Sequence, residues 1–180
     1  MNFKPIVEEM FDHANFSVSE NLRDGRKVEI RAQRPEDRED LEAAIARMSD
    51  DSLYRRFFVA KHHFSEKEVA YFLNIDFVNH VALVVVTHED DKQAIVGAGR
   101  YVVVQLGRAE VAFAVVDEYQ GQGVGAALMR ALSAIARQAG VKELIAEVLA
   151  SNGPMLKVFE KSGLQMSTKR EGPVVHVKLT

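Results

Sequence analysis

The sequence predicts one mixed α/β domain in which helices flank a central, mostly antiparallel sheet. Three observations lead to this fold class. Three β-branched, apolar segments follow one another between residues 80 and 116, apolar residues recur at helical spacing over residues 124–139, and strand-like segments return after residue 142. With 180 residues and 47% hydrophobic content the chain is long enough to bury one core, and no Pro-, Ser- or Gly-rich linker divides it.

The first third of the chain predicts a β-hairpin and then short helices. The strand-like segments 16–22 and 27–32 flank Asp24 and Gly25, which tolerate the positive φ angles of a tight turn. Pro35, followed by two acidic residues, marks the start of a helix. Three short helices are expected from apolar residues at helical spacing: Leu41, Ile45 and Met48; Leu53, Phe57 and Phe58; and, after the capping box of Ser65 and Glu68, Val69, Phe72 and Leu73.

The remaining chain predicts a sheet interrupted by two helices. Strands are expected over residues 80–87, 95–104 and 110–116, joined by polar loops at 88–93 and 105–108. A long helix begins at Val124 and ends at Gly140, the residue type best suited to a left-handed helix cap. The last elements are a strand over 143–149, a short helix over 154–161 and a strand pair over 164–168 and 174–179.

Composition and charge exclude several functional classes. The net charge of -3 and the pI near 6.1 give no general positive field that would attract nucleic acid or an anionic membrane. The sequence has no cysteine, which excludes disulfides, thiolate metal sites and a cysteine nucleophile and is typical of a reducing cytoplasm. The first 16 residues mix acidic with apolar residues and contain no signal-like or membrane-spanning stretch. We expect a cytoplasmic protein without a nucleic-acid or membrane partner.

A glycine-rich loop, Gly121-Gln122-Gly123-Val124-Gly125, lies between a predicted strand and the long helix. Backbone N–H groups at a helix N-terminus bind anions, and glycines let a diphosphate approach closely. A phosphate-bearing cofactor is therefore the expected ligand, although glycines also serve simply to form a tight turn.

Two other phosphate-binding patterns fit this loop less well. A Walker A loop needs a lysine after its last glycine, and here Ala126 and a second alanine follow. The dinucleotide-binding pattern G-x-G-x-x-A is formally met by Gly121, Gly123 and Ala126, with acidic residues roughly 20 positions later. However, the loop follows strands predicted to be antiparallel, and the chain that remains is too short for a doubly wound sheet.

The loop resembles the acetyl-CoA signature Q/R-x-x-G-x-G/A of the GNAT acetyltransferase superfamily, met here by Gln120, Gly123 and Gly125. The predicted order of strands and helices is also the order of that superfamily, and Asn152 begins a segment similar to its second motif. The segments SLYRRFF (52–58), GAGRY (97–101), AEVAF (109–113), VLASNGPMLKVF (148–159) and LRDGRKVEIR (22–31) are similar to bacterial Pat-type protein lysine acetyltransferases. The resemblance covers residues 27–180, which implies an acetyltransferase domain preceded by an extension and first hairpin strand over residues 1–26.

The resemblance implies a GNAT-like fold with a splayed strand at the cofactor site, and acetyl-CoA as cosubstrate without a metal. The splayed strand would bind the pantetheine arm and the acetyl carbonyl, the loop would bind the diphosphate, and two residues of the second motif would lie against the cofactor. The cofactor-binding residues implied in this way are Phe113, Ala114 and Val115; Gln120, Gly121, Gln122, Gly123, Val124, Gly125 and Ala126; and Asn152 and Phe159.

Glu110 is the candidate general base, because the glutamate of the matching A-E-[VI]-A-F segment has that role by the Pat resemblance. From the residues alone, an ordinary outward-facing strand carboxylate is the favoured interpretation of Glu110. Phe159 stands where many superfamily members have a tyrosine that protonates the leaving thiolate, so that acid is missing here. Because the sequence has no cysteine and no G-x-S-x-G motif, we expect the amine to attack the thioester directly. Residues 50–64 correspond to the region that shapes the acceptor groove in similar proteins.

Three functions remain open at this point. The first is acetylation of lysine side chains on proteins, with acyl-CoA synthetases as the substrates that the Pat resemblance implies. The second is N-acetylation of small amines, and the third is a non-catalytic module that senses acetyl-CoA. The sequence has no dense acidic patch suited to a polycationic amine, which favours the first function over the second.

Overall fold

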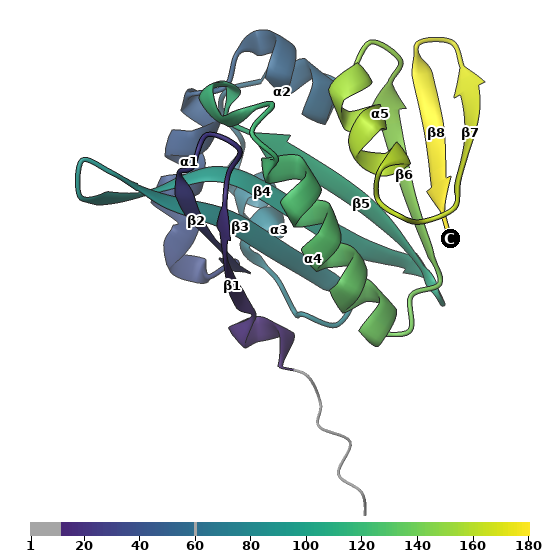
Figure 1. Cartoon of the computed structure of the whole chain (residues 1–180), viewed down its shortest axis with the longest axis horizontal. Helices are drawn as coiled ribbons and strands as arrows, with labels where there is room; N and C mark the ends of the chain where they lie inside the picture. Colours follow the sequence, from purple (N-terminus) through teal and green to yellow (C-terminus); the bar gives the residue numbers. More distant parts are fainter. Residues whose placement is uncertain (1–11, 60) are drawn as a thin grey trace, which may run out of the picture.

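The computed structural model describes residues 12–59 and 61–180. Within these residues, eight strands form one sheet in the order β1-β2-β3-β4-β5-β6-β8-β7 (Figure 1). Neighbouring strands are antiparallel except β5 and β6, which are parallel. This confirms the mixed, mostly antiparallel sheet. The strands are β1 Ser17–Asn21, β2 Lys27–Ala32, β3 His80–Glu89, β4 Lys92–Gln105, β5 Arg108–Val115, β6 Glu143–Leu149, β7 Met166–Glu171 and β8 Val174–Leu179.

Five α-helices in the described residues pack on the two faces of this sheet. They are α1 Arg38–Ala46, α2 Asp50–Phe57, α3 Glu66–Leu73, α4 Val124–Gln138 and α5 Gly153–Glu160. The long helix α4 crosses one face, and α1 and α3 lie behind the sheet on the opposite face (Figure 1). None of these helices combines the length and apolar character needed to cross a membrane. The expected extension over residues 1–26 lies partly outside the described residues, and its described part contains β1, which belongs to the same sheet.

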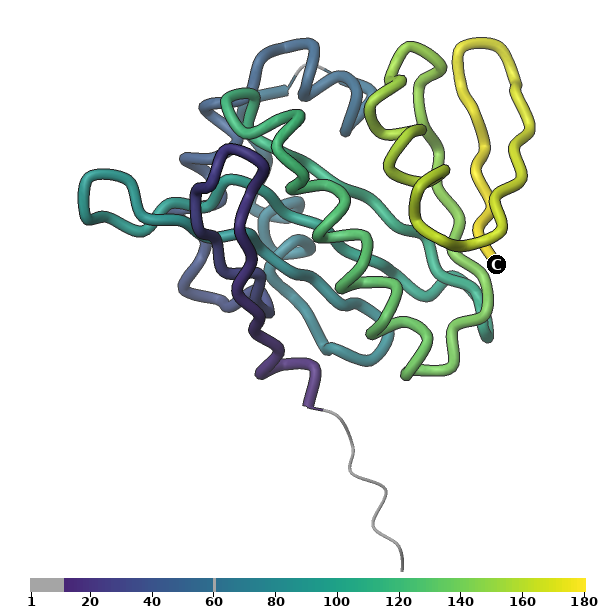
Figure 2. Tube along the Cα trace, viewed as in Figure 1, coloured from purple at the N-terminus to yellow at the C-terminus, as the bar shows by residue number. Residues whose placement is uncertain are grey.

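The predicted lengths of the polar loops at 88–93 and 105–108 were wrong. Both loops are shorter, because the strands continue through most of these residues. Asp90 and Asp91 alone connect β3 to β4, and both have positive φ angles of 48° and 62°. Two consecutive residues with positive φ angles form the turn that matches the twist of a β-hairpin. The polar residues on either side of this turn therefore remain hydrogen-bonded in the two strands. The hairpin tip projects well beyond the body of the protein (Figure 2). The expected turn over 169–173 is likewise shorter, because the edge strand β7 continues to Glu171.

The starts of two helices also differ from the sequence prediction. Pro35 begins a 3-10 turn over Pro35–Asp37, and α1 follows at Arg38. The helix expected from Leu53, Phe57 and Phe58 begins earlier, at Asp50, because Ser49 is its N-cap and the Ser49 hydroxyl accepts a hydrogen bond from the Ser52 backbone N–H at 3.2 Å. The capping box before α3 is present as predicted.

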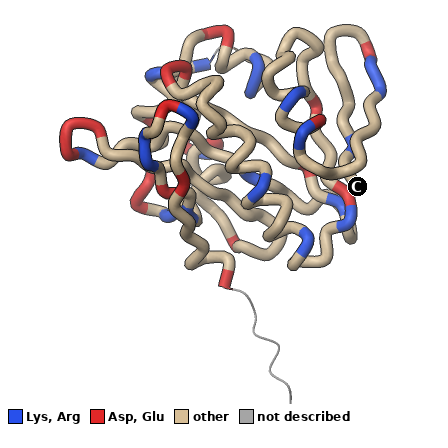
Figure 3. Tube along the Cα trace, viewed as in Figure 1, with Lys and Arg blue, Asp and Glu red and all other residues tan. Residues whose placement is uncertain are grey.

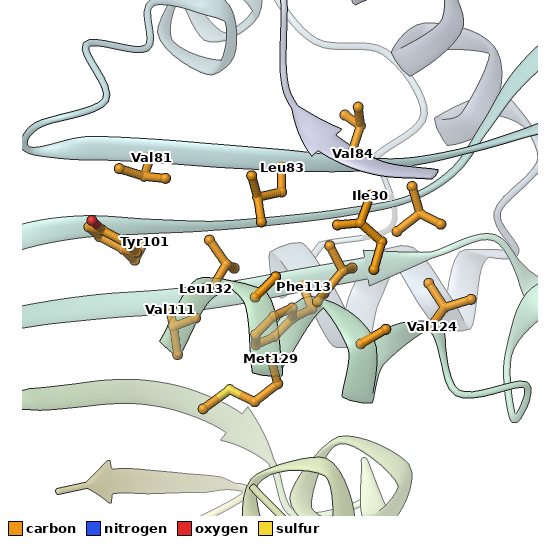
Figure 4. Close-up of a cluster of buried hydrophobic side chains, with 14 of the residues drawn as sticks. Ile30, Val81, Leu83, Val84, Tyr101, Val111, Phe113, Val124, Met129 and Leu132 are labelled. Carbon is orange, nitrogen blue, oxygen red and sulfur yellow. The ribbon is translucent and has the colours of Figure 1, made fainter. Parts of the chain in front are cut away.

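The core lies between the sheet and α4 (Figure 4). Leu128 and Leu132 of α4 are fully buried, and Phe113 of β5 packs among them. The helix lies close to the sheet because β4 has glycines beneath it. A Cβ atom on Gly99 would lie 2.9 Å from Phe113 Cδ1 and 3.0 Å from Leu132 Cδ1, which is too close for ordinary packing.

A buried ion pair fixes the end of β2 to the 3-10 turn before α1. The guanidinium of Arg31 donates two hydrogen bonds to the carboxylate of Asp37, at 2.7 and 2.8 Å, and both side chains are almost completely buried. Asp37 also accepts a hydrogen bond from the Arg34 amide at 2.7 Å. Because both charges are removed from water, the loss of either partner would leave an unpaired buried charge.

Candidate functional site

A fork between β5 and β6 forms the centre of the candidate site. These parallel strands share only three residue pairs, and the pairing ends at Glu110 and Ile145. Beyond that point β5 stays paired with β4 up to Val115, while β6 stays paired with β8 up to Leu149. The two strands diverge toward the end of the sheet where α2, α5 and the start of α4 lie (Figure 1). This is the expected splayed strand, and it leaves a backbone edge of β5 free to bind a ligand.

The glycine-rich loop at the start of α4 presents unpaired backbone donors. Gly121 and Gly123 have φ angles of 75° and 97°, a region in which side chains other than glycine are strained. Within the described residues, the N–H groups of residues 121–126 donate no hydrogen bond. Consecutive free N–H groups at the positive end of a 15-residue helix form an anion site.

Interactions from three parts of the chain hold the loop in place. The Gln120 side chain donates hydrogen bonds to Ser52 Oγ at 2.9 Å and to the Val115 carbonyl at 3.0 Å. Arg23, from the β1–β2 turn, donates from Nη1 to the Gly121 carbonyl and from its backbone N–H to the Gln122 carbonyl, both at 3.1 Å. The backbone N–H of Gln120 was also predicted to bind the diphosphate. It instead donates a hydrogen bond to the Asp117 carbonyl.

A groove of about 640 Å³ runs along the fork and the loop. None of the described residues that line it is acidic, although the whole chain carries a net charge of -3. Basic positions occur on both α2 and α5, on the two sides of the fork (Figure 3). The groove is therefore a local site for a polyanion. The basic residues that line the groove are Arg23, Arg55, Arg56, Lys157 and Lys161.

Most of the predicted cofactor residues lie together in this groove. Phe113, Ala114 and Val115 line it from β5, and the loop and Asn152 line it from the other side. Gln122 and Phe159 are not among its lining residues. The Phe159 ring is buried against the Phe113 ring, with centroids 5.9 Å apart, so Phe159 supports β5 from the core side.

The sequence prediction assigned Arg55 and Arg56 to the acceptor region over 50–64 rather than to this groove, and it missed the other basic residues of the lining. Lys157 and Lys161 are four residues apart at the end of α5, which places them on one side of the helix and was a usable signal. Arg55 has a buried Nε atom without a hydrogen-bond partner in the described structure, and it faces the groove from α2. Nothing in the sequence near Arg23 or Arg55 indicates that either residue reaches the loop.

Glu110 lies at the vertex of the fork, as the last residue of β5 paired with β6. Its side chain is exposed, and strand alternation directs it to the sheet face opposite α4, on the same side as Ala112 and Ala114. The charge of Glu110 acts on Arg56 of α2. Burial lowers the pKa of Arg56 to about 10, and the negative charge of Glu110 partly offsets that shift. Glu110 is therefore an accessible carboxylate at the point where the two strands separate.

The charge and the free backbone groups of the site suit acetyl-CoA. The free N–H groups and the basic lining suit phosphates, and the unpaired edge of β5 offers hydrogen bonds to the amides of a pantetheine arm. In the described residues, no cluster of three or more His, Asp or Glu side chains could hold a metal ion.

Comparisons with known proteins agree with this geometry. The sequence model of the acetyltransferase (GNAT) family matches residues 43–164. An acetyltransferase of Pseudomonas aeruginosa is 36% identical over 137 residues, which cover 76% of this chain and 74% of that protein. Acetyltransferase Pat of Mycolicibacterium smegmatis is 31% identical over 144 residues, covering 79% of this chain but 42% of that protein. This chain therefore spans less than half of the mycobacterial protein.

Among solved structures, the GNAT domain of the S. lividans PAT protein superposes with a TM-score of 0.80 at 33% identity, covering 90% of this chain and 95% of that domain. A cAMP-binding acyltransferase from Mycobacterium smegmatis superposes with a TM-score of 0.62 at 27% identity, over 91% of this chain and 46% of the other. The family match spans more than half of the sequence, and the structure contains the strand fork and the glycine-rich loop that the resemblance implies. The chain belongs to the acetyltransferase (GNAT) family, whose members use acetyl-CoA.

Proposed function

We propose that the protein transfers the acetyl group of acetyl-CoA to lysine side chains of other proteins, with acyl-CoA synthetases as its substrates. The similarity to Pat-type acetyltransferases supports this acceptor class. A cytoplasmic location is part of the proposal and rests on the composition of the sequence.

The proposal gives Glu110 the role of general base. An acceptor lysine with a pKa near 10.4 is about 3.4 units from its neutral form at pH 7, which costs about 4.6 kcal/mol. The Glu110 carboxylate removes a proton from the amine, directly or through a water, while the nitrogen attacks the thioester carbonyl. The CoA thiolate, with a pKa near 8.5 like that of a cysteine thiol, leaves without a tyrosine acid. The position of Glu110 at the vertex of the fork is the single observation that carries this proposal.

The test is site-resolved acetylation of a purified bacterial acyl-CoA synthetase, with acetyl-CoA as donor and mass spectrometry as readout. For Glu110→Gln we expect kcat/KM to fall by about 10²- to 10⁴-fold, because the amide keeps the shape of the side chain but accepts no proton. Affinity for CoA, measured by calorimetry, should stay unchanged. Glu171→Gln is the matched control, since Glu171 lies on the far edge strand β7 and pairs with Lys169 and His176.

Three outcomes would count against parts of the proposal. Full turnover by Glu110→Gln would remove Glu110 as the base. Thiol release with a panel of small amines, but no acetyl-lysine on any protein of a bacterial lysate, would favour the small-amine enzyme. CoA binding without turnover on either acceptor class would favour a sensing module.

A further inference from the structure

The turn between β1 and β2 lies beside the glycine-rich loop at the start of α4 (Figure 1). It belongs to the part of the chain that precedes the family match, which begins at residue 43. Arg23 of this turn nevertheless lines the groove along the fork and the loop, which we call the acetyl-CoA groove. The first hairpin therefore adds a cation to this groove that the matched family segment does not supply.

The Arg23 side chain is held along the glycine-rich loop. Its backbone N–H donates to the Gln122 carbonyl and its Nη1 donates to the Gly121 carbonyl, both at 3.1 Å. A Cβ atom on Gly123 would lie 3.9 Å from Arg23 Nε and 4.0 Å from Arg23 Cγ, so the side chain also passes beside Gly123. A guanidinium fixed in this way loses less conformational entropy on binding an anion than a freely moving one.

The turn that carries Arg23 is itself anchored to the protein. The Arg26 guanidinium lies 3.8 Å from the centroid of the Tyr119 ring, and the buried Tyr119 hydroxyl donates a hydrogen bond to Glu89 at 2.6 Å. Asp24 accepts hydrogen bonds from the backbone N–H and the Nε of Arg26, at 3.0 and 2.7 Å. These contacts require no ligand, so they hold Arg23 in position before a ligand binds.

The Arg23 guanidinium has no counterion among the described residues. No carboxylate oxygen of these residues lies within 4.0 Å of it, and the neighbouring Asp24 pairs with Arg26 at 2.6 Å instead. Of its five N–H donors, the protein uses only one, on Nη1. The described residues that line the groove include no acidic side chain. A fixed cation with free donors in such a groove suits a phosphate.

The geometry of the loop separates this cation from the free N–H groups. The described peptide bonds are all trans, so the carbonyl and the N–H of one peptide group point in opposite directions. Arg23 bonds the carbonyls of Gly121 and Gln122, which share their peptide groups with the N–H groups of Gln122 and Gly123. An anion on those N–H groups therefore lies across the loop backbone from the Arg23 guanidinium. Arg23 is placed for a second phosphate of the same ligand.

We propose that Arg23 binds the 3′-phosphate on the ribose of CoA and makes the protein select CoA over 3′-dephospho-CoA. The free N–H groups of the loop hold the diphosphate, and the 3′-phosphate is the other phosphate that CoA carries. This inference rests on the assignment of the groove to acetyl-CoA, and it is independent of the acceptor of the acetyl group.

The test compares CoA with 3′-dephospho-CoA, which lacks only that phosphate, by calorimetry on the full chain. We expect the native protein to bind CoA about tenfold more tightly, the lower end of the effect of one charge-assisted hydrogen bond. Arg23→Met should reduce this preference to about twofold or less. Both ligands share the diphosphate and the pantetheine arm, so a general distortion of the loop weakens both and cancels in the ratio.

Three further variants locate the effect. Arg130→Met is the matched control and should keep the full preference, because Arg130 lies on α4, pairs with Glu20 at 2.6 Å and does not line the groove. Arg23→Lys keeps the charge and should retain more of the preference than Arg23→Met. Lys161→Met removes a competing cation, since Lys161 lines the same groove from α5, and it should leave most of the preference intact.

Equal affinity of the native protein for the two ligands would overturn the proposal. An unchanged preference in Arg23→Met, or its loss in Lys161→Met, would do so as well. If the native protein bound neither ligand, the assignment of the groove to acetyl-CoA would fail together with this proposal. Because the readout is a ratio of binding constants, a protein that acetylates no lysine would still give the expected ratios, so this proposal and the proposed function can fail separately.

Discussion

Gly123→Ala and Gly125→Ala separate two contributions of the glycine-rich loop. The first is its left-handed backbone conformation, and the second is the open space beside its free N–H groups. Gly123 precedes α4 with a φ angle of 97°, and a Cβ atom there would meet nothing nearer than Arg23 Nε at 3.9 Å. Its substitution therefore adds backbone strain without a steric clash. Gly125 is within the first turn of α4 and lines the acetyl-CoA groove, and a Cβ atom there would lie 3.4 Å from Val158 Cγ2.

For Gly123→Ala we expect a loss of about 1–2 kcal/mol in the free energy of unfolding, the cost of a left-handed conformation for alanine. In a domain of this size that loss lowers Tm by roughly 2–8 °C. For Gly125→Ala we expect stability to be retained, because alanine favours helix over glycine. Its methyl group enters the groove beside the free N–H groups. Loss of one charge-assisted hydrogen bond to phosphate, about 1.5–3 kcal/mol, would weaken CoA binding roughly 10- to 150-fold.

Thermal denaturation without ligand and calorimetric titration with CoA measure these two effects separately. The expected pattern is a destabilised Gly123→Ala protein and a stable Gly125→Ala protein with weakened CoA binding. If Gly125→Ala bound CoA as tightly as the native protein, the loop would not be the diphosphate site. If both variants lost equal stability, the assignment of strain to Gly123 would be wrong.

Three further predictions concern stability and the support of the loop. Asp37→Asn should lower the free energy of unfolding by about 3–5 kcal/mol in urea titrations, because it leaves a buried arginine unpaired, whereas Asp24→Asn, which disrupts an exposed pair, should change it little. Burial, then the charge of Arg100, lowers the pKa of His80 from 6.5 to about 4, so the unfolded chain binds a proton at higher pH than the folded protein. Stability should therefore fall by about 3 kcal/mol as the pH drops from about 6.5 to 4, and His80→Gln should abolish that part of the pH dependence. Arg23→Ala should raise the Kd for CoA several-fold with little change in Tm, because the lost hydrogen bond to the Gly121 carbonyl is exposed; an unchanged Kd would show that the loop holds its shape without Arg23.

The sequence predicted the order of the elements and the position of the glycine-rich loop, because these depend on local patterns. The β-branched composition of the strands, the capping box at Ser65 and the apolar side of α4 are all read from neighbouring residues. The fork between β5 and β6 came from the family resemblance, since no local pattern indicates where two parallel strands stop pairing. The hairpin at Asp90 was misjudged because polar residues continue a ladder once a two-residue turn has formed.

The basic groove could not be predicted from the sequence, for a different reason. Arg23, Arg55 and Lys157 lie on three separate elements, and their charges combine only after the sheet has brought the β1–β2 turn, α2 and α5 to one end. The chain as a whole is slightly acidic, so its net charge gives the opposite indication. The role of Glu110 as base stays a prediction, which the Glu110→Gln variant tests.

The contact between the first hairpin and the glycine-rich loop makes them thermodynamically coupled. Arg23 bonds the loop across 98 residues of chain, and its hairpin includes the edge strand β1. A ligand that orders the loop must also favour docking of the hairpin, and by linkage a docked hairpin raises affinity for that ligand by the same free energy. A macromolecule that paired with the open edge of β1 and drew the hairpin away would lower cofactor affinity without touching the groove. Binding at the first strand can thus change the occupancy of the acetyl-CoA groove from a distance.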